Sequence, residues 1–260
     1  MRGLVSYVYD QRDNFNIAAV NMSLGGQSYS SQEDCDNDNA ALKAAVDNLR
    51  SAGVATVIAS GNDGLGDAIS SPACISSAIS VGASTGSDEV AFFSNSAPWL
   101  TSLAPGTDID SAIPGGEFAS KDGTSMAAPH VAGAVAVLNS VVPEAYVDEI
   151  EESLASSGVF ITDPRNGVEV PRVQVDAAAQ ALNELYDLTN INLELKPVIT
   201  GLDMPVSVTH AGDASGRLFI GLQRGKIIIY DGTRIMSTPF LDISPLVCPI
   251  LWVSLDTLKL

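Results

Sequence analysis

The sequence predicts an α/β fold with a mainly parallel sheet, followed by a small antiparallel β segment near the C-terminal end. Short apolar runs rich in branched residues, at 16–22 and 54–59, are separated by a helical pattern, which is typical of a right-handed βαβ unit. After Leu195 the pattern changes to alternating residues with tight glycine turns, which indicates antiparallel hairpins. We therefore expect an α/β unit and a separate β unit.

The elements of the α/β part are expected in a regular order along the chain. Residues 4–9 look like the end of an amphipathic helix, and Asp34 to Asp38 look like an acidic loop. Asp38 or Asn39 can cap the helix that follows, and Gly53 can end it. The remaining expected elements are a helix with the apolar face Leu42, Val46 and Leu49, strands at 54–59 and 78–83, and helices at 127–138, from Pro143 with Val147, Ile150 and Leu154, and at 177–185.

Composition limits the classes of partner. The 260 residues carry a formal net charge of −18, which argues against nucleic-acid backbones and anionic membranes as partners. No leader opens the sequence, and no apolar run is long enough to span a bilayer. Met1 directly precedes what looks like the end of a helix, so we expect the sequence to lack an N-terminal part.

The stretch 123–133 carries the strongest chemical signal. It reads Gly-Thr-Ser-Met-Ala-Ala-Pro-His-Val-Ala-Gly, a glycine-led turn that runs into a helix of small residues, with Pro129 expected in the first turn. A serine is an effective nucleophile only where it is held still beside N–H groups that can bind an oxyanion, and a helix N-terminus provides them. We interpret Ser125 as such a nucleophile. The alternative is that Thr124 or Ser125 simply caps the helix.

Two loops lie where ligands bind in parallel sheets, just beyond the carboxyl ends of strands. The 54–59 strand runs into Ser60-Gly61-Asn62-Asp63-Gly64, and by residue type alone Asn62 is a turn residue. The 16–22 run ends in Ser23-Leu24-Gly25-Gly26, which is either a plain strand exit or an edge where an extended peptide pairs.

The string 123–133 resembles, nearly letter for letter, the active-site serine motif of the subtilisin-like serine peptidases (subtilases). The resemblance implies a three-layer αβα fold and a serine endopeptidase that forms its acyl-enzyme on Ser125. It also implies that Asn62, in the pattern Ala-x-Gly-Asn, is the oxyanion-hole donor, while segments such as 92–95 are scaffold. The substrate-binding residues that it implies are Ser23, Leu24, Gly25, Ala59, Ser60, Gly61 and Thr124.

The expected catalytic group is incomplete. Serine acyl chemistry needs a base within hydrogen-bond reach, and the chain has two histidines. His130 should lie about 7.5 Å further along the helix than Ser125, pointing away from the cleft into the packing beneath. His210 looks like a strand-end residue. In subtilases the aspartate and histidine precede the serine, so both would lie upstream of Met1, and we expect this chain alone to be inactive.

The chain divides into four predicted parts. Residues 1–187 form a subtilisin-like peptidase domain lacking its N-terminal part, and 188–197 form a protease-sensitive linker. Residues 198–247 resemble one blade of the six-bladed β-propeller sugar dehydrogenases of the glucose or sorbosone type, and 248–260 form an aberrant tail. The alternative functions are therefore a sugar-binding or sugar-oxidising propeller fragment and a peptide-binding pseudoenzyme. One blade cannot close a propeller, so no cofactor pocket is expected.

Cysteines, metals and partners complete the predictions. With Cys248 in the tail, Cys35 and Cys74 are either a disulfide pair or two buried free thiols. No cofactor and no metal site is expected, although the resemblance allows a structural calcium ion whose ligands cannot be assigned. The expected partners are a polypeptide substrate and the missing N-terminal part of the same domain. The resemblance also implies a secreted protein.

Overall fold

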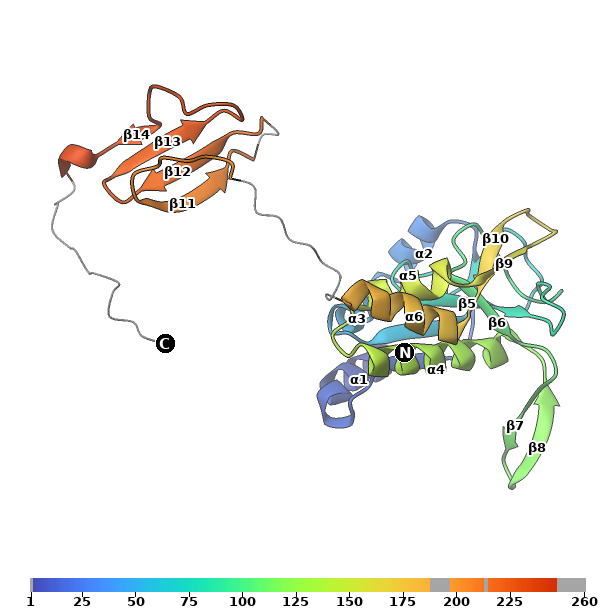
Figure 1. Ribbon diagram of the computed structural model, residues 1–260. Coiled ribbons are helices and arrows are strands. Elements are labelled where there is room, and N and C mark those ends of the chain that lie inside the picture. Colours follow the sequence, from blue (N-terminus) through green and yellow to red (C-terminus); the bar gives the residue numbers. More distant parts are fainter. Residues whose placement is uncertain (1, 188–196, 213–214, 247–260) are drawn as a thin grey trace. The chain divides into compact units, whose positions relative to one another are not determined.

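The computed structural model describes residues 2–187, 197–212 and 215–246 (Figure 1). The chain divides into two compact units, residues 1–191 and 192–260, which we describe separately. The tail at 248–260, with Cys248, and all of the linker except Pro197 lie outside the described residues, so the predicted domain limits remain predictions. Within the described ranges, no helix has both the length and the apolar character needed to cross a membrane.

A six-stranded sheet forms the centre of the first unit, in the order β1-β3-β5-β6-β10-β9. The first five strands in this order pair in parallel, and β9 is antiparallel to β10 at one edge. This arrangement confirms the predicted α/β class with a mainly parallel sheet. The strands are β1 (Ala19–Met22), β3 (Ala55–Ala59), β5 (Ile79–Ser84), β6 (Ser102–Pro105), β9 (Val159–Thr162) and β10 (Glu169–Arg172).

Helices cover both faces of this sheet (Figure 1). All residues of β3 are buried, and because neighbouring side chains point to opposite faces, they enter different cores. Val57 packs in the cluster that contains Val131, whereas Ile58 packs in the cluster that contains Leu49. One layer holds α1 (Arg2–Phe15), α2 (Gln32–Asp38) and α3 (Ala40–Ser51), and the other holds α4 (Thr124–Val141), α5 (Val147–Ser156) and α6 (Val175–Tyr186).

Two short antiparallel pairs complete the first unit. Strand β2 (Ser28–Tyr29) pairs with β4 (Ile69–Ser70). Strand β7 (Ile109–Ile113) pairs with β8 (Glu117–Lys121), and this hairpin projects from the body of the unit in Figure 1.

Several predicted element limits were wrong. The acidic stretch 34–38 is helical, because the Ser31 hydroxyl accepts from the Asp34 N–H and acidic residues in the first turn interact favourably with the helix dipole. Asn39 is the N-cap residue of α3 but forms no capping bond, since its side-chain amide donates to the Cys35 carbonyl instead. Helix α5 begins at Val147 rather than at Pro143.

A disulfide joins Cys35 of α2 to Cys74, with the two Cα atoms 6.0 Å apart. Both residues are fully buried in the core on the α1–α3 side of the sheet. The bond ties α2 to the turn at 71–75.

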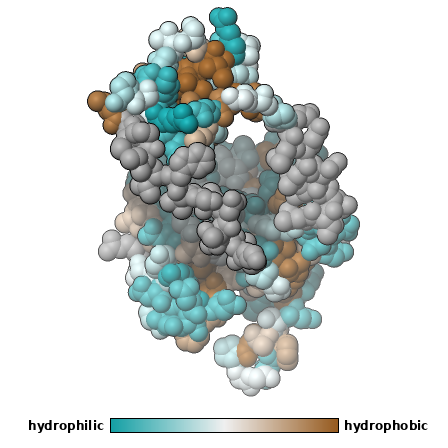
Figure 2. All heavy atoms as spheres, turned by 60° about the vertical axis from the view of Figure 1, so that its left-hand side comes forward, coloured by the Kyte–Doolittle hydropathy of each residue, from teal (hydrophilic) through white to brown (hydrophobic). Residues whose placement is uncertain are grey.

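The second unit is a four-stranded antiparallel sheet in the order β11-β12-β13-β14. It fulfils the prediction of a small antiparallel β segment, but such sheets occur in many folds, so the likeness to a propeller blade remains a resemblance. Large apolar side chains such as Val208 and Phe240 are exposed on it, and apolar surface is visible on this unit in Figure 2. Its elements are β11 (Pro205–His210), β12 (Leu218–Leu222), β13 (Lys226–Tyr230), β14 (Leu241–Asp242) and the 3-10 turn η2 (Ser244–Leu246).

Candidate active site

The loop after β3 and the start of α4 meet at the carboxyl edge of the parallel sheet. Asn62 lies in that loop, and its Oδ1 atom accepts hydrogen bonds from the backbone N–H and the hydroxyl of Thr124, each at 2.9 Å. The Thr124 hydroxyl also accepts from the Gly61 N–H at 3.3 Å. Because Ser125 follows Thr124, these bonds bring Asn62 beside the predicted nucleophile.

These contacts determine which way the Asn62 amide faces. A backbone N–H can only donate, so the atom that faces Thr124 must be the amide oxygen, and the Nδ2 group is left on the other side. In the part of the chain that the structure describes, Nδ2 has no hydrogen-bond partner. The side chain therefore presents two N–H donors that remain free for a ligand.

A second free donor lies close by. Gly123, the N-cap residue of α4, has a φ of 149°, and a Cβ atom built on it would lie 3.6 Å from Asn62 Nδ2 and 3.7 Å from the Ser125 backbone nitrogen. The Ser125 N–H, in the first turn of the helix, also lacks a partner among the described residues. Two unpartnered donors are therefore each within 3.7 Å of one point beside Gly123.

The start of α4 differs from its prediction. The helix begins at Thr124, not at 127, and neither Thr124 nor Ser125 caps it, so the capping interpretation was wrong. Pro129 consequently lies in the second turn rather than the first. Lacking an N–H, it cannot bond to the Ser125 carbonyl four residues earlier, and the Ser23 hydroxyl donates to that carbonyl at 2.8 Å.

The other predicted substrate-binding residues fall into two groups. Ser23, Leu24 and Gly25 are exposed at the end of β1. Ala59 and Ser60 are buried, with exposed fractions of 3% and 0%, so they support the loop from beneath its surface.

His130 is exposed, not packed beneath the helix as predicted. Its Nδ1 atom donates to the carbonyl of Met126 at 2.8 Å, within the same helix. The reason is helical geometry: Ala127, Val131 and Ala134 are directed into the core, and a residue adjacent to Val131 lies about 100° round the axis. The other histidine, His210, ends β11 in the second unit and is exposed.

Among the described residues, no side chain hydrogen-bonds to the Ser125 hydroxyl, and His130 is engaged with its own helix. In the same ranges, no group of three or more His, Cys, Asp and Glu residues lies close enough to hold a metal ion.

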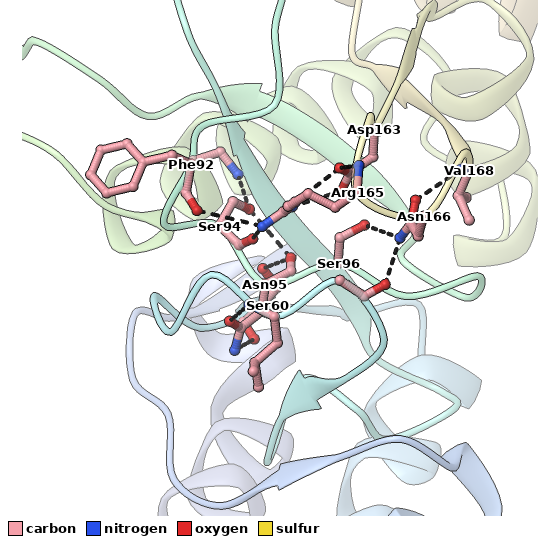
Figure 3. Close-up of polar contacts among 12 residues, drawn as sticks. Ser60, Phe92, Ser94, Asn95, Ser96, Asp163, Arg165, Asn166 and Val168 are labelled. Atoms are coloured by element: carbon pink, nitrogen blue, oxygen red, sulfur yellow. Dashed lines mark hydrogen bonds and ion pairs between the residues drawn. The ribbon is translucent and has the colours of Figure 1, made fainter.

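Sequence reasoning missed one residue beside this site. Asn95 lies in the segment 92–95, which was assigned to scaffold, yet its buried side chain bonds to the loop that carries Asn62 (Figure 3). In the sequence, the only sign was an asparagine within a segment of mainly apolar and small residues. Such an asparagine does not reveal which groups its side chain will bond to.

A buried ion pair holds that segment from its other side (Figure 3). Asp163 is fully buried, and both its oxygens accept from Arg165, at 2.9 Å from Nε and 2.6 Å from Nη2. Arg165 Nη1 in turn donates to the Ser94 carbonyl at 2.7 Å. Burial raises the pKa of Asp163, but hydrogen bonds from Arg165 and Ser96 outweigh burial and hold that pKa below its ordinary value.

This pKa shift predicts an acid-sensitive fold. Because the folded-state pKa of Asp163 is lower than the unfolded value of about 4, its contribution to stability is present above that value and is lost as the pH falls through the folded value. We expect Asp163→Asn to cost about 2 kcal/mol at neutral pH and to flatten this part of the pH dependence. Urea unfolding from pH 2.5 to 7 measures both effects.

The matched control is Asp148→Asn, which removes an exposed carboxylate that pairs with Arg50. Its cost should stay below about 1 kcal/mol. An Asp163→Asn variant with the same stability and the same acid sensitivity as the unmodified chain would refute the assignment.

Comparison with known proteins identifies the family. The model described as "Subtilase family" matches residues 3–181, more than half of the chain. Subtilisin E from Bacillus subtilis (strain 168) is 38% identical over 149 residues, covering 56% of this chain and 37% of the relative. The major intracellular serine protease of the same organism is 36% identical over 153 residues, covering 57% and 44%.

Solved structures agree with this result. The patellamide maturation protease PatA matches with a TM-score of 0.60 and 27% identity, over 71% of this chain and 70% of that chain. A cold adapted subtilisin-like serine proteinase matches with a TM-score of 0.55 and 29% identity, over 66% and 60%. The chain spans only 37% of the length of subtilisin E and 57% of that of subtilisin DY. The family match over most of the first unit, together with the parallel sheet, shows that this chain belongs to the subtilase family of subtilisin-like serine peptidases.

Proposed function

We propose that this chain carries the nucleophile and the oxyanion hole of a subtilisin-like serine endopeptidase. The observation that supports the proposal is the pair of unpartnered donors, Asn62 Nδ2 and the Ser125 N–H, within 3.7 Å of one point beside Gly123. A nucleophile next to two preorganised donors is the arrangement that acyl transfer requires.

The proposed reaction begins with attack by the Ser125 hydroxyl oxygen on a peptide carbonyl carbon. The carbonyl oxygen gains negative charge and accepts from Ser125 N–H and Asn62 Nδ2, while a base takes the hydroxyl proton. The C–N bond then breaks, the amine leaves with a proton, and an acyl-serine remains for water to hydrolyse.

A polypeptide in extended form is the proposed substrate. Within the described ranges β1 is the terminal strand of the sheet order, and the exposed residues Ser23 to Gly25 follow it directly. An extended chain can add main-chain hydrogen bonds along such an edge. The acidic balance of the chain favours no nucleic acid or anionic membrane as a partner.

Two parts of the proposal go beyond family membership. We propose that the general base and its orienting carboxylate are supplied by a polypeptide segment other than the described residues, which would be the remaining part of the catalytic domain. Secretion also stays a proposal, since one relative bears the name of an intracellular protease.

The test supplies the base chemically. We expect the purified chain to show no measurable hydrolysis of an extended peptide p-nitrophenyl ester above background, because a serine hydroxyl without a base is a weak nucleophile. After subtraction of the hydrolysis that imidazole causes without protein, added imidazole should produce saturable, protein-dependent hydrolysis that rises with imidazole concentration, and Ser125→Ala should abolish this part.

The outcomes separate the alternatives. Protein-dependent turnover with imidazole, above the protein-free rate, that survives in Ser125→Ala would refute the nucleophile assignment. Turnover without imidazole that disappears in Ser125→Ala would show that the base is already present in this chain. Saturable binding of the peptide with no Ser125-dependent turnover would instead favour a peptide-binding pseudoenzyme.

A further inference from the structure

We infer that Asn95 is a positioning residue for the oxyanion donor: its buried amide organises the loop 60–65 and thereby holds the Asn62 side chain in place. The inference rests on the proposed function of Asn62 and adds a residue from a different segment of the chain. Asn95 has an exposed fraction of 0%, and none of its hydrogen bonds goes to Ser125 or to Gly123.

The Asn95 oxygen holds the loop on the C-terminal side of Asn62. Its Oδ1 atom accepts from the backbone N–H of Asp63 at 3.0 Å and from that of Leu65 at 3.1 Å. Both donors are backbone groups, so the amide oxygen must face them. These two bonds fix the main chain immediately after Asn62.

The Asn95 nitrogen holds the other side of the same loop. Its Nδ2 atom lies 3.4 Å from the Ser60 carbonyl, 3.1 Å from the Ser70 hydroxyl and 3.3 Å from the Asp63 carboxylate. The backbone N–H of Asn95 donates to the Gly61 carbonyl at 3.0 Å. One residue therefore contacts the loop both before and after Asn62, and it needs an acceptor and a donor on one planar group to do so.

The loop lies directly against this amide. Gly61 has a φ of 112°, and a Cβ atom on it would collide with the Nδ2 atom of Asn95 and the hydroxyl of Ser70. The positive φ and the close approach allow only glycine here without displacement of Asn95. The position of the loop is thus coupled to that of Asn95 by steric contact as well as by hydrogen bonds.

Asn95 is itself held from the opposite side (Figure 3). The turn between β9 and β10 contributes Arg165, which donates to the Ser94 carbonyl at 2.7 Å. Asn166 of the same turn donates to the Ser96 hydroxyl at 3.2 Å and to the Gly66 carbonyl at 2.7 Å. The residues on both sides of Asn95 are therefore anchored, which makes it a fixed support rather than a side chain that follows the loop.

A double-mutant cycle tests this role in the imidazole-dependent assay. Asn95→Asp keeps the shape and the acceptor but replaces the donor by an oxygen that faces the Ser60 carbonyl and the Asp63 carboxylate. We expect it to lower kcat per folded molecule about 10- to 100-fold, with KM nearly unchanged, because a displaced oxyanion donor weakens only the transition state. In an Asn62→Ala background the same substitution should change kcat by less than about 2-fold, because the group that Asn95 positions is already absent.

Two further variants keep the test decisive. Asn39→Ala removes a half-buried asparagine that bonds to Cys35 and Ser71 but forms no hydrogen bond to the loop 60–65, and it should leave kcat per folded molecule unchanged in both backgrounds. Ser70→Ala removes one contact of the Asn95 amide. It serves as the test variant if the Asn95→Asp protein fails to fold. It should lower kcat about 2- to 5-fold, and the loss should again disappear in the Asn62→Ala background.

The outcomes distinguish a failure of the positioning role of Asn95 from a failure of the proposed oxyanion role of Asn62. Equal losses with and without Asn62 would overturn the positioning role of Asn95 and leave the oxyanion assignment intact. If Asn62→Ala leaves kcat unchanged, or if the unmodified chain shows no Ser125-dependent turnover, the proposed function fails, and the role of Asn95 fails with it.

Discussion

Replacing Asn62 by alanine is expected to lower the imidazole-dependent kcat by about 100- to 1,000-fold while KM changes little. This magnitude is the one characteristic of a side-chain oxyanion donor in subtilisins and is not calculated for this chain. The effect should fall on kcat because the donor meets negative charge that develops only in the transition state.

The structural reason for so large an effect is the fixed orientation of the amide. The two bonds from Thr124 hold the Asn62 oxygen, so the Nδ2 group needs no reorientation when the oxyanion forms. Thr124 also joins this amide to the helix that carries Ser125. Alanine at 62 removes the donor and leaves the Thr124 N–H without its acceptor.

The matched control is Asn37→Ala, which removes an exposed asparagine of α2 outside the site. It should leave both kcat and KM within about 2-fold of the unmodified chain. Initial rates over a range of ester concentrations, at constant imidazole, give the two parameters. A loss in Asn62→Ala that appears in KM alone would contradict the oxyanion role.

Removal of the disulfide is expected to have the largest effect on stability. A bond between residues 39 apart in sequence restricts the unfolded chain, and the loop-entropy treatment gives a stabilisation of about 4 kcal/mol for a loop of this size. The double variant Cys35→Ala/Cys74→Ala should therefore unfold at a much lower urea concentration. Both sulfurs are buried, so two small cavities add to the loss.

Urea unfolding without reductant measures this difference, with Cys248→Ala as the background for both proteins so that no third thiol can exchange. Reductant should destabilise the protein that retains Cys35 and Cys74 and leave the double variant unchanged. A difference below about 1 kcal/mol, or an equal response of both proteins to reductant, would contradict the expected contribution.

Much of the site could be predicted because its signals are local. Buried runs of branched residues identified the strands that become β1, β3 and β5, and their alternation with helices indicated a parallel sheet. The motif around Ser125 and the loop around Asn62 each follow or precede such an element directly. Since parallel strands end at one edge of a sheet, the two segments could be expected to meet.

The misassigned helix α2 shows where local signals mislead. An acidic stretch is typical of a loop, but a serine cap three residues before Asp34 and acidic side chains in the first turn favour a helix. The sequence therefore did contain the signal for helix α2, but it lay in the order of the residues rather than in their composition.

The amino-acid sequence was sufficient to predict the strands that become β1, β3 and β5, the glycine-led turn before Ser125 and the loop that carries Asn62, because burial patterns and glycine requirements act within a few residues. The three-dimensional structure was needed to show that Thr124 orients the Asn62 amide, that Ser23 bonds to the carbonyl freed by Pro129, and that Asn95 supports the loop. These contacts join residues 30 to 102 positions apart. Such bonds form between groups that packing brings together, and their geometry follows from how the sheet and helices meet rather than from any local pattern.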